Sequence, residues 1–304
     1  MGKRLAAKIT GVAGYVPPRL LTNADLERMV DTSDEWIQQR VGIRERHIVD
    51  KGMATSHLAT AAAQQVLEKT RTRHGATRAW GFDLSGACSG FVYALTIGAQ
   101  FVGAGTHKKA LVIGSDVMSS IIDYQDRNTC VLFGDGAGAV LLEPSESDAE
   151  GILDFVHDID GSGGEFLCMP GGGSRHPASP VTLDQKMHYV HQDGKQVFKY
   201  AVRRMAEIAC GLLERNGYSH KDVALVVPHQ ANLRIIRAMQ ERLGLDDSQV
   251  LVNIDRFANT TGGTIPLGLN DAVGQGRLKK GDLVVVVAVG AGYTAGGVLM
   301  RWAY

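Results

Sequence analysis

The chain repeats itself, and this repeat is the strongest constraint on its fold. Residues 101–114 (FVGAGTHKKALVIG) resemble residues 272–290 (AVGQGRLKKGDLVVVVAVG), since each has a helix end, a Gly-x-Gly turn, two lysines and a buried strand. The segment FGDGAGAVLLE likewise resembles VGAGYTAGGVLMRW. A recurring pattern of this kind indicates two halves with related folds.

Within each half, apolar runs of strand length alternate with stretches of helix length, which predicts layered α/β structure. A first strand and turn are expected near the N-terminus, where Gly and Pro interrupt the apolar residues and argue against a signal peptide. The other predicted strands are 111–116, 131–143, 223–228, 249–254 and 282–289. The predicted helices are 25–29, 55–70, 89–102, 197–216, 231–243 and 265–275.

Residues 146–193 separate the two halves and contain the runs GSGGE and PGGGSRHP. Such a composition is typical of turns, so we expect a long surface excursion that covers a site. The resulting organisation is an N-terminal half at 1–145, the excursion at 146–193 and a C-terminal half at 194–304.

The two halves differ in length just before corresponding turns. Cys88 precedes Lys108 by 20 residues, and Asn259 precedes Lys279 by 20, so these two residues occupy equivalent positions. Between Gly217 and Asn259 lie 42 residues, which hold a strand, a helix and a second strand. The 16 residues from Thr72 to Cys88 have room for one strand only. We therefore predict that the first half lacks one strand–helix unit.

Composition excludes several classes of protein. The chain carries 32 basic and 32 acidic residues, so its charge predicts no nucleic-acid partner. The four cysteines have no CxxC spacing and no disulfide framework, which favours a reducing compartment, and we expect a cytoplasmic enzyme. No metal site and no bound cofactor are expected. No apolar run reaches 18 residues, so no membrane span is expected.

Cys88 is the first candidate for chemistry. It follows a strand-like run, GFDLSGA, at the predicted start of a helix. Unpaired N–H groups and the helix dipole at such a place favour the thiolate, and the surrounding small residues permit a tight turn. The alternative is a small residue in a packed corner, because buried free cysteines are common.

Two further residues follow predicted strands. His229 in VVPHQANLRII could accept or donate a proton, although a lone histidine is more often structural. Asn259 in NIDRFANTTGG could donate a hydrogen bond, although it could equally cap a helix. The segment GAGY, which includes Ala291, could supply a backbone N–H to an oxyanion.

Several segments together resemble the β-ketoacyl-[acyl-carrier-protein] synthase III family over nearly the whole chain. They are TSDEWIQQRVGIRERHI, FDLSGACSGFVYAL, RNTCVLFGDGAGAVLL, VFKYAV, VPHQANLRII and NIDRFANTT. The resemblance implies a thiolase-like fold with two duplicated halves in a five-layer αβαβα arrangement, and a homodimer. It also implies a decarboxylative condensation of an acyl-CoA primer, such as acetyl-CoA, with malonyl-acyl-carrier protein, which starts fatty-acid synthesis.

The resemblance also assigns roles to residues of this chain. Cys88 matches the acylated nucleophile, and His229 and Asn259 match the pair that supports decarboxylation and condensation. The backbone N–H groups of Cys88 and Ala291 match the oxyanion hole. The positions that match the CoA-binding tunnel are Thr32, Trp36, Arg40, Gly194, Phe198 and Asn232, and those that match the basic patch for acyl carrier protein are Lys199, Arg234 and Arg242.

Simpler interpretations stay open at this point. Trp36 and Arg40, four residues apart, could form an ordinary surface cation–π pair, and the basic residues could be solvated helix charges. The chain could also be a related synthase of secondary metabolism. Because of the short segment before Cys88, it could instead be a structurally compromised, inactive homologue.

Overall fold

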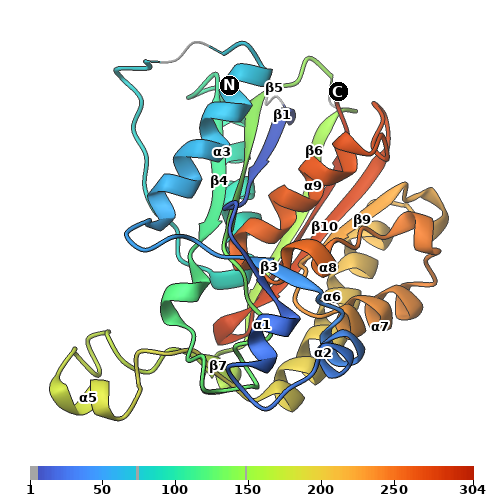
Figure 1. Ribbon diagram of the computed structural model, residues 1–304. Coiled ribbons are helices and arrows are strands. Elements are labelled where there is room, and N and C mark those ends of the chain that lie inside the picture. Colours follow the sequence, from blue (N-terminus) through green and yellow to red (C-terminus); the bar gives the residue numbers. More distant parts are fainter. Residues whose placement is uncertain (1–5, 73–74, 148) are drawn as a thin grey trace.

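Two β-sheets, one from each half of the chain, form the framework of the computed structural model, which describes residues 6–72, 75–147 and 149–304 (Figure 1). In the first sheet the order is β1 (Ala7–Tyr15), β5 (Gly136–Pro144), β4 (Ala110–Asp116). In the second it is β6 (Gly151–Ile159), β11 (Thr294–Arg301), β10 (Leu283–Gly290), β9 (Leu225–Pro228). Neighbouring strands are antiparallel except β9 and β10, which are parallel.

Helices cover both sheets and fill the space between them. The central layer is α4 (Gly90–Gly103) and α9 (Thr264–Gly274), whose buried side chains pack with residues of both sheets in one core. The outer layers are α3 (Thr55–Lys69) on the first sheet, and α6 (Gly194–Arg215) with α7 (Leu233–Leu243) on the second. This is the predicted αβαβα arrangement, and it explains why all eight residues of the central strand β10 are buried.

The remaining elements are short. Two small sheets pair β2 (Leu20–Thr22) with β3 (Glu45–His47), and β7 (Leu167–Cys168) with β8 (His191–Gln192). The short helices are α1 (Asn23–Glu27), α2 (Asp34–Val41), α5 (Pro180–Asp184) and α8 (Ile254–Phe257). In the described part of the chain, no helix combines the length and the apolar character that a membrane crossing requires.

The duplication is visible strand by strand, and so is the missing unit. β1, β5 and β4 occupy the places of β6, β11 and β10, with the same antiparallel pairing. Among the described residues no strand occupies the place of β9, so β4 is an edge strand whereas its counterpart β10 is paired on both sides. Leu111 of β4 is accordingly 37% exposed. The prediction that the first half lacks a strand–helix unit is thus consistent with the topology.

Three strand predictions were wrong in detail. The run before Cys88, residues 81–86, forms no strand, because the neighbour with which it would pair is absent from the sheet. Residues 249–254 make only an isolated bridge between Val226 and Val250, since α8 begins at Ile254. The strand expected at 131–143 begins only at Gly136, because residues 131–132 form a turn and Phe133 makes only an isolated bridge with Asn259.

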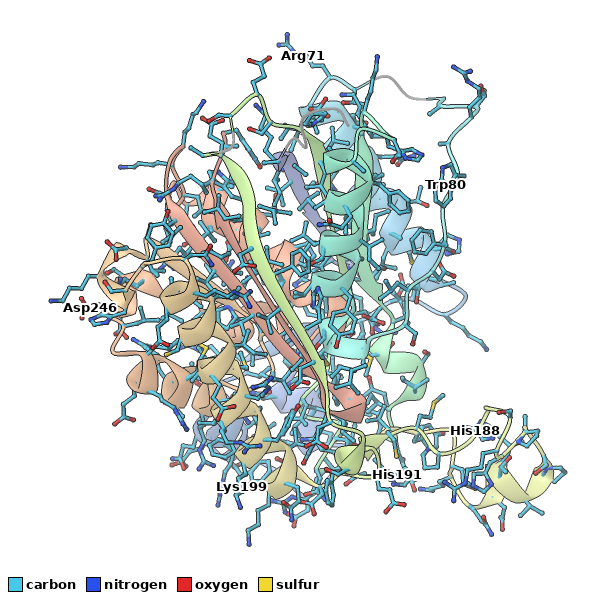
Figure 2. The ribbon with its side chains drawn as sticks, turned by 180° about the vertical axis from the view of Figure 1, so that it is seen from behind. Arg71, Trp80, His188, His191, Lys199 and Asp246 are labelled. Carbon is cyan, nitrogen blue, oxygen red and sulfur yellow. The ribbon has the colours of Figure 1, made fainter. Side chains whose placement is uncertain are left out.

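Part of the segment at 146–193 belongs to the second sheet, although its composition predicted a surface excursion. Its first part contains β6, a nine-residue edge strand that pairs with β11. Residues around α5 and His188 project away from the body of the molecule (Figure 2). Leu167 and Gln192 of the same segment line the cavity described below, so part of the segment does lie over a site, as expected. The turn residues of this segment concealed the strand, because only every second side chain of β6 faces the protein.

Candidate active site

Cys88, His229 and Asn259 line one cavity of about 510 Å³ where the two halves of the chain meet. Cys88 and His229 are 141 residues apart in the sequence, and His229 and Asn259 are 30 apart, but each lies in a connection that leads into a central or outer helix. All three side chains are buried, with exposed fractions of 6%, 1% and 5%. The structure therefore brings together the three residues for which catalytic roles are expected.

The turn at Cys88 is held by the second half of the chain. Thr294 Oγ1 donates a hydrogen bond of 3.1 Å to the carbonyl of Gly86, and Ser89 Oγ donates one of 3.2 Å to the carbonyl of Thr294. A Cβ on Gly290 would lie 2.8 Å from the backbone nitrogen of Cys88, so only glycine fits beside Cys88. Ala87 has a φ of +46°, which gives the turn the strained backbone common at functional sites.

The resting form of Cys88 is the thiol, contrary to the expectation from the helix terminus. Burial, with a smaller contribution from the carboxylate of Asp116, raises the pKa of Cys88 to about 12. The backbone N–H groups of Ala291 and Cys88 act in the opposite direction. Helix α4 begins at Gly90, two residues beyond Cys88, and desolvation outweighs the field of its N-terminus.

His229 follows β9, and its backbone N–H donates to the carbonyl of Val287 over 2.8 Å. Its Nδ1 lies 2.7 Å from Oγ1 of Thr264, whereas its buried Nε2 has no partner among the described residues. Burial lowers the pKa of His229 to about 3, so the imidazole is neutral. A buried nitrogen without a partner is costly, and His229 lines the cavity, so Nε2 is available to a ligand there.

Asn259 is the counterpart of Cys88 in its backbone as well as in its position. Ala258 before it has a φ of +55°, as Ala87 has a positive φ before Cys88. The turn is held by the first half, because Asn259 N donates to the carbonyl of Leu132 over 3.0 Å. Asn259 Oδ1 accepts from Thr261 N over 2.9 Å, a local contact that leaves the amide NH₂ as its remaining polar group.

Most of the residues expected to bind CoA also line this cavity. They are Trp36, Arg40, Gly194, Phe198 and Asn232. Asn232 additionally caps α7, since its Oδ1 accepts from Arg234 N over 2.8 Å, and its amide donates to the carbonyl of Arg40 over 3.2 Å. Thr32 is not among the lining residues.

Arg127 was not anticipated from the sequence. Its guanidinium lies 4.5 Å from the ring centroid of Trp36, the place expected for Arg40. The same guanidinium forms an ion pair of 3.4 Å with Asp31. No spacing rule could have found this contact, because Arg127 is 91 residues away from Trp36.

The three expected docking residues lie on helices α6 and α7. Arg234 lines the cavity, and its guanidinium lies 5.5 Å from the ring centroid of Phe198. Lys199 lies in the second turn of α6 and is exposed. Arg242 lies in the last turn of α7, about 12 Å further along the helix from Arg234, and its charge acts on Cys210 near the far end of α6.

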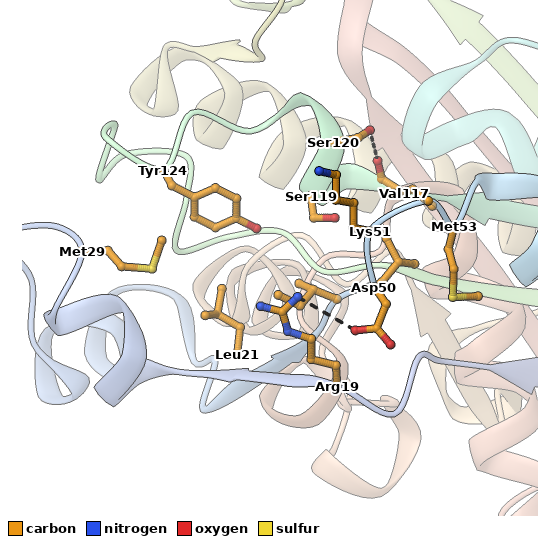
Figure 3. A pocket seen from close by; sticks show the side chains of 13 residues that line it. Arg19, Leu21, Met29, Asp50, Lys51, Met53, Val117, Ser119, Ser120 and Tyr124 are labelled. Carbon is orange, nitrogen blue, oxygen red and sulfur yellow. Dashed lines mark hydrogen bonds and ion pairs between the residues drawn. The ribbon is translucent and has the colours of Figure 1, made fainter.

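A second hollow of about 430 Å³ lies beside the end of β4 (Figure 3). Arg19 and Asp50 face each other there at 4.0 Å, with Val117 and Ser119 opposite. Its lining includes none of the expected catalytic residues. Among the described residues, no group of three or more His, Cys, Asp or Glu side chains could hold a metal ion.

Comparisons with known proteins agree on one family. Residues 82–161 match the family described as 3-oxoacyl-[acyl-carrier-protein] synthase III, and residues 213–302 match its C-terminal family. The β-ketoacyl-[acyl-carrier-protein] synthase III of Solibacter usitatus is 56% identical, with 98% of this chain and 99% of the relative aligned. That of Koribacter versatilis is 51% identical, with 98% of each chain aligned.

Solved structures show the same architecture. The 3-oxoacyl-[acyl-carrier-protein] synthase III of Aquifex aeolicus has a TM-score of 0.88 and 38% identity, covering 97% of this chain and 100% of that one. The priming β-ketosynthase from the R1128 polyketide pathway has a TM-score of 0.90 and 30% identity, covering 100% of this chain and 98% of that one. Both values show that the fold is shared.

The alignments also bear on the missing strand. The alignment with the Solibacter usitatus relative spans 328 positions, whereas this chain has 304 residues. At least 24 positions of the aligned relative therefore have no counterpart here. A strand and a helix of ordinary length fit into that number of residues, in agreement with the vacant place beside β4.

Proposed function

Because the chain belongs to the β-ketoacyl-[acyl-carrier-protein] synthase III family, we propose that it condenses an acyl-CoA primer with malonyl-acyl-carrier protein. The products are a 3-oxoacyl-acyl-carrier protein, carbon dioxide and CoA, and the reaction starts fatty-acid synthesis. The observation that carries this proposal is the convergence of Cys88, His229 and Asn259 on one buried cavity.

In the first half-reaction, the sulfur of Cys88 attacks the carbonyl carbon of the acyl-CoA thioester. The new S–C bond forms, the bond to the CoA sulfur breaks, and the thiol proton leaves with CoA. The backbone N–H groups of Cys88 and Ala291 stabilise the oxyanion, since both already point at the sulfur closely enough to lower its pKa. Gly290 keeps this approach open.

In the second half-reaction, malonyl-acyl-carrier protein loses carbon dioxide, and the resulting enolate attacks acyl-Cys88. The amide NH₂ of Asn259 is available to donate to the enolate oxygen, because Oδ1 is occupied by Thr261 N. His229 lines the same cavity with a free Nε2. Burial excludes water, which strengthens both interactions.

Trp36 lines the cavity, and the guanidinium of Arg127 stacks on its ring. A planar ring beside a cation is suited to a nucleobase such as the adenine of CoA. Gly194, Phe198 and Asn232 continue the lining, and Thr32 and Arg40 complete the expected set. No separate cofactor is required, because CoA is a substrate.

Acyl carrier protein is the second substrate carrier, and we assign its docking to Lys199 and Arg234, with Arg242 further along α7. Cationic side chains steer an acidic partner toward the cavity. A homodimer and a cytoplasmic location belong to the same proposal, the latter supported by the four free cysteines.

Mass spectrometry after mixing with acetyl-CoA tests the function directly. We expect an acetyl adduct on Cys88 that is absent from the Cys88→Ser variant. His229→Ala should retain this adduct and lose condensation with malonyl-acyl-carrier protein. If wild-type protein forms no adduct at any acetyl-CoA concentration, the chain is the inactive homologue that the absent strand–helix unit would favour.

A further inference from the structure

One short turn organises both polar side chains that face the nucleophile. The turn Thr261–Gly263 leads into α9, which begins at Thr264. The backbone N–H of Thr261 holds Oδ1 of Asn259, as described above, and its carbonyl lies 2.9 Å from Oγ1 of Thr264. That same Oγ1 lies 2.7 Å from Nδ1 of His229. The turn therefore reaches Asn259 directly and His229 through Thr264.

The hydrogen positions around Thr264 follow from the number of hydrogens available. Its hydroxyl carries one hydrogen, and the carbonyl of Thr261 can only accept. Two electronegative atoms this close repel unless a hydrogen lies between them. Both contacts contain a hydrogen in one arrangement only: the hydroxyl donates to Thr261, and Nδ1–H of His229 donates to the hydroxyl oxygen.

We propose that Thr264 is a positioning residue that holds His229 as the Nδ1–H tautomer, so that the resting enzyme presents a bare Nε2 to the cavity. Asn259 then offers a hydrogen-bond donor to the malonyl unit, while His229 offers a proton acceptor. The inference rests on the proposed function for the identity of the reaction, but the tautomer itself does not depend on it.

A bare Nε2 fits the proton balance of the condensation step. Acylation of Cys88 consumes no proton, since the thiol proton leaves with CoA. Condensation consumes one: carbon dioxide departs, the carbon–carbon bond forms, the thioester bond to Cys88 breaks, and the sulfur must end as a thiol. Its high pKa makes protonation of the released sulfur obligatory near neutral pH.

Nε2 of His229 is the group that takes up this proton, which solvent water supplies as the malonyl unit enters and before it fills the cavity. Burial keeps the imidazole neutral before the malonyl unit binds. The carboxylate of the incoming malonyl unit adds a negative charge beside it, which favours the imidazolium. The added proton hydrogen-bonds to the enolate oxygen as carbon dioxide leaves, and then moves to Cys88 Sγ when the tetrahedral intermediate collapses.

Nitrogen-15 NMR of protein labelled at histidine tests the tautomer. The His229 signal is identified by its loss in His229→Gln. We expect a protonated Nδ1 and an unprotonated Nε2 in wild type and in Thr264→Ser, which keeps the hydroxyl. Thr264→Val has a similar shape without the hydroxyl, and its His229 should shift to a mixture or to the Nε2–H tautomer. A wild-type Nε2–H signal, or an unchanged tautomer in Thr264→Val, overturns the proposal.

Single-turnover kinetics supply the second readout. Acylation of Cys88 by acetyl-CoA should change less than about twofold in Thr264→Val, and condensation should fall at least tenfold and return to near wild type in Thr264→Ser (tenfold is about 1.4 kcal/mol). Equal loss of both steps in Thr264→Val contradicts a role through His229. Absence of acylation in wild type contradicts the proposed function instead, and the NMR result then still decides the tautomer.

Discussion

The guanidinium of Arg127 stacks on the ring of Trp36 with 4.5 Å between its carbon and the ring centroid, although 91 residues separate the two in the sequence. The pair joins the segment that follows β4 to helix α2 at the edge of the cavity. A guanidinium stacked on an aromatic ring is suited to a planar ligand, because a nucleobase can take the place of either partner and stack on the other.

Arg127→Ala and Trp36→Ala should each weaken CoA binding. A cation–π or stacking contact contributes about 0.5–2 kcal/mol, so we expect roughly 2- to 30-fold higher dissociation constants by calorimetry. Arg242→Ala is the matched control, because this cation lies away from the cavity. Equal weakening in Arg242→Ala would indicate general electrostatic attraction rather than a specific contact.

Asp116→Asn should make Cys88 more reactive. The Asp116 carboxylate helps to raise the pKa of Cys88, and its Oδ2 accepts from Gly262 N over 2.9 Å, a hydrogen bond that an amide oxygen can keep. Alkylation of Cys88 by iodoacetamide, followed by mass spectrometry between pH 7 and 10, should therefore be faster in the variant. A rate that is unchanged at every pH would show that the carboxylate does not act on the thiol.

His229→Gln should reduce the acid sensitivity of the fold. The pKa of His229 is lowered from 6.5 to about 3 in the folded protein, so the unfolded chain binds the proton more readily. The associated stability, on the order of 5 kcal/mol, is complete above pH 6.5 and is lost as pH falls toward 3. Chemical denaturation at pH 7, 6, 5 and 4 should give a steeper decline for wild type than for the variant; parallel declines would contradict the buried neutral imidazole.

Ala258→Gly should leave the protein as stable as wild type or more so. Ala258 has φ +55° and ψ −160°, a region that glycine occupies without strain, and relief of about 1–2 kcal/mol offsets the loss of one buried methyl. Ala62→Gly in the middle of α3 is the control and should cost about 1 kcal/mol. Urea denaturation that shows equal losses would mean that the turn before Asn259 is unstrained.

Leu111→Lys should suppress association into species larger than a dimer. β4 has no neighbour on one side in the described structure, and an exposed apolar edge strand recruits other chains. Leu20→Lys in β2 is the control, since Leu20 is similarly exposed, at 43%, but lies in a different small sheet. Light scattering should decrease in the first variant and not in the second; equal decreases would point to surface hydrophobicity in general.

The sequence predicted the two-sheet architecture, because long apolar strands and the internal repeat are recognisable without knowledge of the surrounding structure. β10 and the central helices α4 and α9 lie close to their predicted ranges. β6 was missed because an edge strand with one exposed face resembles a turn-rich loop. Residues 81–86 were assigned to a strand on local composition, but a strand needs a neighbour, and that neighbour is absent.

The candidate site shows the same division. Cys88, His229 and Asn259 were recognisable because each follows a strand or turn in a distinctive local motif. The protonation state of Cys88 could not be predicted in the same way. Burial depends on the whole fold, and its effect on the pKa of Cys88 outweighs that of the nearby helix terminus. Arg127 and Thr264 act across 91 and 35 residues, and one sequence contains no signal for such contacts.

Each of the two turns at the site is held by residues from the other half of the chain. Gly290 and Thr294 contact the Cys88 turn, and the carbonyl of Leu132 accepts a hydrogen bond from the Asn259 turn. During synthesis on the ribosome the segment with Cys88 emerges early, but the residues that hold it emerge almost last. The turn at Cys88 therefore cannot adopt its final geometry until the end of translation, and a truncated product has Cys88 without the backbone N–H of Ala291. A truncated translation product would therefore have no partial activity toward acyl-CoA.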